Sequence, residues 1–353
     1  MTETPETFVA ESALSAPSMV TSDQEAVTLA KIHFDIDGSV KRFATEKDDT
    51  FLLTSRQGRK YTLKIANAAE DPIEISFQID LLQHIAAVDP KLPVPRAIAD
   101  RNNKLQFSYI DSAGRCRQVH LLTYQEGIPL SEVTANAHQR ERVGEALAAL
   151  RLAMAGYSHG ADSRVVAWDI KHLAKLTSLL DEIRDPDRRR LLEAGLDRFA
   201  TISDRLAKCR TQVLHNDFSK SNIVVSKLDE RFVTGIIDFG DAVRTAIAID
   251  VSTALLNQLP MHEVDDFFAH GFDVLRGYLR VADLTDEEID LVPHLVMGRI
   301  VARALLTIWR ARLFPENAQY ILRNTNQGWH QLHWFMARSM DAISGDFSHR
   351  VNQ

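Results

Sequence analysis

Two polar loops set between apolar strands decide the fold of this chain. Residues 214–225 are LHNDFSKSNIVV, and residues 236–242 are IIDFGDA. β-branched runs on either side of polar residues predict short buried strands joined by turns. Asp217 lies in the first loop, Asn222 follows it by five positions, and Asp238 follows the next strand. Oxygen donors of this kind are the ligands that a hard divalent cation such as Mg²⁺ prefers.

A free carboxylate, an Asn, an Asp and a distant Lys together favour phosphoryl transfer. Asp217 would orient a substrate hydroxyl and accept its proton, while Asn222 and Asp238 would hold the metal. The distant Lys is Lys64, in the strand-like run YTLKI at 61–65. Because side chains alternate along a strand, Lys64 should face away from its apolar neighbours and into a cleft.

Working outward, the first third of the chain is rich in predicted strands and the rest is mainly helical. Strands are expected at 40–44, 50–54, 60–65 and 118–124, and a helix is expected after Pro72. From residue 129 helical composition dominates at 137–156, 169–184, 186–208, 245–258, 261–280 and 285–312. The fold class is therefore α+β and bilobal, with a tail at 1–28, a nucleotide-binding lobe at 29–124 and a helical catalytic and acceptor-binding lobe at 125–353.

The phosphate-covering loop has an unusual sequence. No G-x-G-x-x-G precedes Lys64, and residues 44–50 (ATEKDDT) occupy the position of that loop. We expect their backbone N–H groups and the Thr50 hydroxyl to face the phosphates.

Composition excludes several other classes of protein. The 353 residues include 41 Lys and Arg against 48 Asp and Glu, a net charge of −7. This acidity disfavours nucleic acid as a partner, and no run of about 18 apolar residues predicts a membrane span. Cys116 and Cys209 are in no metal-ligand spacing. We expect a cytoplasmic protein, either a monomer or a homodimer.

The two loops resemble those of the aminoglycoside phosphotransferase and choline kinase superfamily, the protein-kinase-like small-molecule kinases. Within it, the stretches 45–72, 121–130, 164–173 and 315–329 are most similar to hydroxylysine kinases and to kinase domains fused to class III aminotransferases. A eukaryotic protein kinase is disfavoured because the chain has no glycine loop, H-R-D or A-P-E motif.

The resemblance implies a role for each matching residue. His215 and Asp217 belong to the catalytic loop, with Asp217 as the base, and Asn222 and Asp238 match the magnesium ligands. Lys64 matches the lysine that pairs with the phosphates. Three residues match the hinge whose backbone contacts the nucleobase: Leu122, Thr123 and Tyr124. Asp250 matches an acidic residue that braces the catalytic loop, although an ordinary helix N-terminal carboxylate is the alternative.

Three positions depart from the family pattern. The helix after Lys64 should offer it a Glu, but the alignment gives Gln78, with Glu74 one turn earlier. Ser219 replaces a basic residue directed at the γ-phosphate in many relatives, with Lys220 beside it. Asn216 replaces the Gly usual in antibiotic-modifying members, which disfavours an antibiotic as acceptor.

These observations together predict a kinase that uses Mg²⁺ and ATP or GTP to phosphorylate the hydroxyl of a small amino-alcohol. The resemblance favours hydroxylysine as acceptor, with GTP as donor. Choline, ethanolamine, homoserine and aminoglycosides stay open as acceptors, as do a nucleotide-binding pseudokinase and a metal-dependent hydrolase. Trp168 and Trp329 are candidates for the acceptor pocket. For Arg299, Arg303 and Arg310, pairing within the protein is favoured over binding of an acceptor carboxylate.

Overall fold

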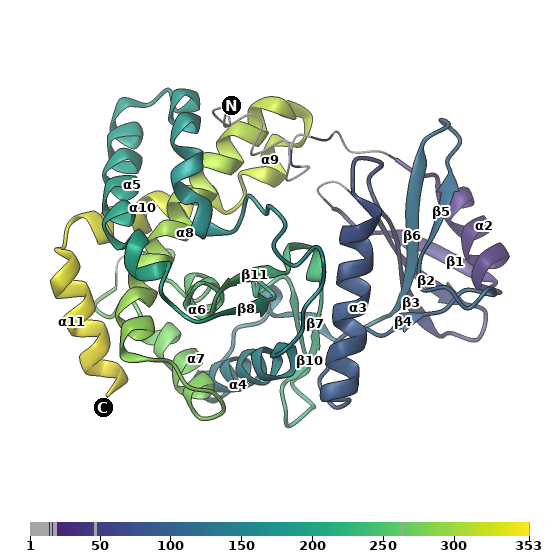
Figure 1. Ribbon diagram of the computed structural model, residues 1–353, viewed down its shortest axis with the longest axis horizontal. Helices are drawn as coiled ribbons and strands as arrows, with labels where there is room; N and C mark the ends of the chain where they lie inside the picture. The colour runs from purple at the N-terminus through teal and green to yellow at the C-terminus, as the bar shows by residue number, and fades with distance from the viewer. Residues whose placement is uncertain (1–13, 15, 17–19, 46–47, 263, 353) are drawn as a thin grey trace.

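The computed structural model describes residues 14, 16, 20–45, 48–262 and 264–352. Figure 1 shows a small lobe built on a sheet and a larger, mainly helical lobe, which confirms the predicted α+β bilobal class. The expected tail at 1–28 is only partly described. Within it, residues 23–28 are not a tail, because they form the first turns of helix α2 (Asp23–Phe34).

The sheet of the small lobe is antiparallel, in the order β1-β2-β3-β6-β4, with β5 also paired to β6. Helix α2 covers its outer face, where Ala26, Leu29 and Ala30 pack with alternate strand residues such as Phe51 and Leu63. Sequence analysis missed β4 and β5. The strands are β1 (Gly38–Arg42), β2 (Asp49–Ser55), β3 (Lys60–Ile65), β4 (Ala97–Ile98), β5 (Phe107–Ile110) and β6 (Cys116–Thr123).

Helix α3 (Pro72–Val88) joins the two lobes. It begins where predicted, with Asp71 as N-cap and Pro72 in the first turn. Its residues Phe77, Leu81 and Ile85 belong to the same apolar cluster as the core of the large lobe. In Figure 1 it stands between the sheet and the large lobe. The two lobes therefore share a core along this helix.

The large lobe is built around helix α8. This helix is long and apolar enough by composition to cross a membrane, but 89% of its apolar window is buried inside the protein, as in a core helix. The other helices of this lobe are η1 (Leu130–Glu132), α4 (Ala137–Met154), η2 (Ile170–Glu182), α5 (Pro186–Leu206), η3 (Phe239–Asp241), α6 (Ile247–Leu256), α7 (Ala269–Leu279), η4 (Pro315–Asn317), α9 (Ala318–Ile321), α10 (Thr325–Met336) and α11 (Met340–Val351), and α8 itself is Asp286–Leu313.

The helix expected at 169–184 is a 3-10 helix, η2. Its buried residues Ile170, Leu173, Leu176 and Leu179 recur at every third position. A 3-10 helix has three residues per turn, so this spacing places all four on one face, against the core.

Short strands carry the two polar loops. β7 (Ile128–Pro129), β9 (Ile223–Val225) and β10 (Val233–Ile236) form one small sheet, and β8 (Thr211–Leu214) pairs with β11 (Val243–Ala246) in another. The first loop thus leaves one sheet at Leu214 and enters the other at Ile223. This arrangement holds residues 215–222 between two separate ladders.

Candidate functional site

The carboxylate of Asp217 is held by Asn222. The Asn222 Nδ2 donates to Asp217 Oδ2 at 2.6 Å and to the Asp217 backbone carbonyl at 3.0 Å. Both hydrogen bonds are donated by the amide nitrogen of Asn222. Its Oδ1 therefore has no hydrogen bond among the described residues. The five-residue spacing predicted from sequence therefore brings these two side chains together.

His215 supports the loop as a buried neutral imidazole. Its Nε2 lies 3.0 Å from the Ile237 carbonyl, and its Nδ1 accepts from the Asp217 backbone N–H at 3.3 Å. A carbonyl can only accept, so the proton is on Nε2. Burial lowers the pKa of His215 to about 4. The ring therefore ties the loop at residues 215–222 to Ile237, the residue before Asp238.

Asn216 explains one departure from the family pattern. Its φ of 62° lies in the left-handed region, which Gly and Asn tolerate better than other residues. Its N–H donates to Asp250 Oδ1 at 2.8 Å, and its carbonyl accepts from Arg299 Nη2. Asp250 thus does brace the catalytic loop, and Arg299 braces it from α8.

Lys64 and Asp238 meet across the cleft between the lobes. The Lys64 Nζ lies 3.3 Å from Asp238 Oδ1. In the strand register Lys64 is opposite Thr50 on β2 and opposite His120 on β6. Leu63 and Ile65 are buried beneath α2. Lys64 and Thr50 therefore share the face turned away from α2, as alternation along the strand predicted.

The charges in the cleft depend on one another. Burial disfavours the ammonium of Lys64, but Asp238, Asp48 and Glu70 together raise its pKa above the ordinary value. Lys64 in turn lowers the pKa of Asp238. Burial, with Asp241 and Asp238 nearby, raises the pKa of Asp217. A positively charged substrate or metal entering the cleft would therefore be favourable.

Neither Glu74 nor Gln78 pairs with Lys64. Glu74 forms an ion pair with Arg164 at 2.7 Å, and no hydrogen bond joins Gln78 to the lysine in the described part of the chain. Arg164 also donates to the carbonyls of Gly240 and Ala242, just after Asp238. Glu74 is thus connected through Arg164 to the loop that follows Asp238. Lys64 pairs with Asp238 instead.

The hinge expected at Leu122–Tyr124 connects β6 to the large lobe. Thr123 is already engaged, because its N–H donates to the Arg96 carbonyl at 2.9 Å and its hydroxyl accepts from the Arg96 N–H. Leu122 is buried against the shared core. Among the described residues, the backbone N–H groups of Tyr124, Gln125 and Glu126 have no backbone partner. The free backbone donors therefore begin at the last predicted position, Tyr124, and continue just after it.

Two oxygens suit a divalent cation. Asn222 offers Oδ1, and Asp238, whose side chain is 55% exposed, keeps one oxygen beyond the one that contacts Lys64. Described His, Cys, Asp and Glu side chains form no cluster of three or more that would hold a metal by themselves. This donor set fits a metal that also takes phosphate oxygens as ligands.

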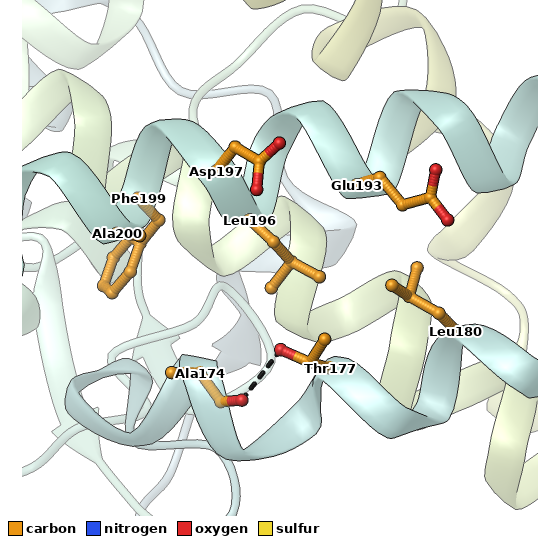
Figure 2. A pocket seen from close by; sticks show the side chains of 8 residues that line it. All are labelled: Ala174, Thr177, Leu180, Glu193, Leu196, Asp197, Phe199 and Ala200. Carbon is orange, nitrogen blue, oxygen red and sulfur yellow. Dashed lines mark hydrogen bonds between the residues drawn. The ribbon is translucent and has the colours of Figure 1, made fainter.

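Burial, together with the charge of Arg140 on α4, lowers the pKa of Lys220, the residue beside Ser219. A cavity of about 200 Å³ between η2 and α5 is lined by none of the predicted site residues (Figure 2). Its polar lining residues are Thr177, Glu193 and Asp197.

Two further cleft residues escaped the sequence analysis. Arg164 lies in a stretch that resembles the family, but no motif marks its role. His120 lies two residues before Leu122 on β6, so strand alternation from Lys64 identifies it. It is buried, and burial with the Lys64 charge lowers its pKa to about 3.

Known proteins share this architecture. By structure the chain is similar to an amicoumacin kinase (TM-score 0.66, 16% identity, 86% of this chain and 94% of that one) and to a microcompartment-associated aminopropanol kinase (TM-score 0.64, 18% identity, 89% and 98%). These likenesses support the kinase-like fold.

Sequence comparison gives relatives of nearly full length. The chain is 23% identical to a hydroxylysine kinase of Mus musculus, over 94% of each chain. It is 25% identical to a homoserine kinase of Rhodospirillum rubrum, over 83% of this chain and 87% of that one. The model of the phosphotransferase enzyme family, APH, matches residues 39–284. The chain therefore belongs to the APH phosphotransferase enzyme family.

Proposed function

We propose that this phosphotransferase moves the γ-phosphate of ATP or GTP to the side-chain hydroxyl of a small amino-alcohol, with hydroxylysine favoured. The observation that carries the proposal is the pairing of two units across one cleft. Asp217 held by Asn222 forms one unit, and Lys64 held by Asp238 forms the other. The similarity to hydroxylysine kinases over nearly the whole chain supports the choice of acceptor.

Each residue has a defined task in the proposed reaction. Asp217 accepts a hydrogen bond from the acceptor hydroxyl and takes its proton as the oxygen attacks the γ-phosphorus in line with the leaving oxygen. Lys64 pairs with the phosphate oxygens, and the Thr50 hydroxyl donates a hydrogen bond to them. Asn222 and Asp238 would hold Mg²⁺, which would offset the negative charge of the phosphates.

The free amides after β6 support binding of the nucleobase. Leu122, Thr123 and Tyr124 would line the base, with the backbone N–H groups of Gln125 and Glu126 as donors. Gln78 is buried near this cleft without replacing the charge of a Glu. The lysine is then neutralised by Asp238 and the phosphates.

Homoserine is the second candidate acceptor, because two homoserine kinases match over 83% and 90% of this chain. The test is nucleoside diphosphate release with hydroxylysine, homoserine, choline, ethanolamine, aminopropanol and an aminoglycoside, each with ATP and with GTP. Release that depends on hydroxylysine supports the proposal. Equal release without any acceptor indicates a hydrolase, and nucleotide binding with no release indicates a pseudokinase; either contradicts it.

A further inference from the structure

Two arginines one turn apart on α8 differ in what they contact. Every nitrogen of the Arg299 guanidinium donates to the protein: Nε to Thr253 Oγ1 at 2.8 Å, Nη1 to the Trp168 carbonyl and Nη2 to the Asn216 carbonyl. Arg299 is thus saturated with structural hydrogen bonds. Its neighbour Arg303 is not.

Arg303 has one protein partner. Its Nη2 donates to Gln331 Oε1 at 3.0 Å, while its Nε is buried with no partner. Its Nη1 has no partner either and keeps contact with solvent. No Asp or Glu pairs with Arg303 in the part of the chain that the structure describes. Burial, together with the charge of Arg299, lowers the pKa of Arg303 to about 10.

The surroundings keep the guanidinium in place. Gln331 is itself held, because its Nε2 donates to the Pro260 carbonyl at 3.2 Å. Gly328, on α10, faces the guanidinium, and a Cβ at that position would lie 3.2 Å from Arg303 Nη2. The arginine therefore lies against a glycine and a fixed amide, with its remaining donors unused.

A partly buried cation without a counterion is costly unless an anion pairs with it. A guanidinium N–H that reaches solvent, as that of Nη1 does, can donate a charge-assisted hydrogen bond to a carboxylate oxygen, and Nη2 beside it carries a second hydrogen. Residues three or four apart on a helix lie on one face, about one turn of 5.4 Å from each other. Since Arg299 contacts the residue before Asp217, Arg303 lies one turn beyond the catalytic loop.

From this we infer that Arg303 binds the carboxylate of the acceptor, so that the substrate is a hydroxy amino acid rather than a simple amino-alcohol or an aminoglycoside. The inference rests on the proposed function and assigns the acceptor-selecting residue of the same site. The hydroxyl is then placed at Asp217 and the carboxylate at Arg303, with the carbon chain between them setting which hydroxyl reacts.

The test compares 5-hydroxylysine with its carboxamide, which has the same shape without the charge. For wild type, we expect a KM at least about 30-fold higher for the amide. The R303M variant should lose that preference, with a raised KM for the acid and little change for the amide, and R303K should restore part of it. The KM for nucleotide should not change. R312Q, which alters an exposed ion pair on the same helix, is the matched control.

Equal use of acid and amide by wild type, or an equal loss for both in R303M, would overturn the inference. A rise in the nucleotide KM alone would also overturn it, because Arg303 would then contact phosphate. If R303M does not fold, the ratio of the KM values for acid and amide in wild type and in R303K still tests the inference. If wild type phosphorylates neither acceptor, the proposed function fails. The affinities of the acid and the amide, measured by calorimetry, then test separately whether Arg303 binds a carboxylate.

Discussion

Replacing Arg299 by Met should damage both stability and turnover. The variant leaves two carbonyls without their donor, that of the buried Asn216 and that of the half-buried Trp168, and an orphaned buried group costs about 1–3 kcal/mol. Burial of the guanidinium is itself unfavourable, and it lowers the pKa of Arg299, so its removal returns part of that cost. We expect a net loss of about 2–4 kcal/mol in the free energy of unfolding.

Turnover should fall with stability because the Asn216 carbonyl fixes the peptide that precedes Asp217. We expect kcat to drop by about tenfold or more in R299M, while the KM for nucleotide changes little. Urea unfolding followed by circular dichroism measures the first effect, and steady-state kinetics measure the second. R312M, on the exposed part of the same helix, should stay within about 0.5 kcal/mol of wild type. A loss below about 1 kcal/mol in R299M would refute the bracing role.

Three further predictions concern the cleft and its supports. K64M should lower kcat/KM for nucleotide by about 100-fold or more, whereas E74Q should cost about tenfold or less, because Glu74 pairs with Arg164; equal losses in steady-state assays would contradict that pairing. Burial lowers the pKa of the His294 imidazole to about 4, so wild type should lose folding stability as the pH falls from 6.5 toward 4, by up to about 1.4 kcal/mol per pH unit. H294Q lacks this titration and should lose less stability than wild type over that range when both are unfolded in urea. The same loss of stability in both proteins would contradict the prediction. Because φ of Asn216 is 62°, N216G should keep its melting temperature and N216V should cost about 1–3 kcal/mol; equal melting temperatures would show that the left-handed backbone is not needed.

Local patterns were sufficient to predict most of the small lobe. Alternation placed Lys64 and Thr50 on one face, and the Asp71-Pro72 start placed α3, because these features depend on near neighbours. The contact between Asp217 and Asn222 followed from the motif, because the two residues are five positions apart and meet within one loop.

Long-range contacts could not be predicted in the same way. Glu74 was weighed as a partner of Lys64, but Arg164, 90 residues further on, takes it. Nothing in either local pattern encodes that meeting. Residues 23–28, the first turns of helix α2, were assigned to the tail, because only Ala26 among them is buried against the sheet. Arg299 and Arg303 lie in similar local sequence. Only their contacts in the folded protein show that Arg299 supports the catalytic loop and that Arg303 keeps free donors.

The central claim is that Asp217 receives the proton of the acceptor hydroxyl, while Lys64 and Asp238 serve the nucleotide. The most direct test is the D217N variant, assayed for phosphorylation of hydroxylysine and for nucleotide binding by calorimetry. Its Asn keeps the size and the contact with Asn222 but cannot take a proton. We expect a loss of kcat by about 100-fold or more, with nucleotide affinity within a few-fold of wild type. Turnover equal to wild type, or nucleotide binding lost together with turnover, would contradict it.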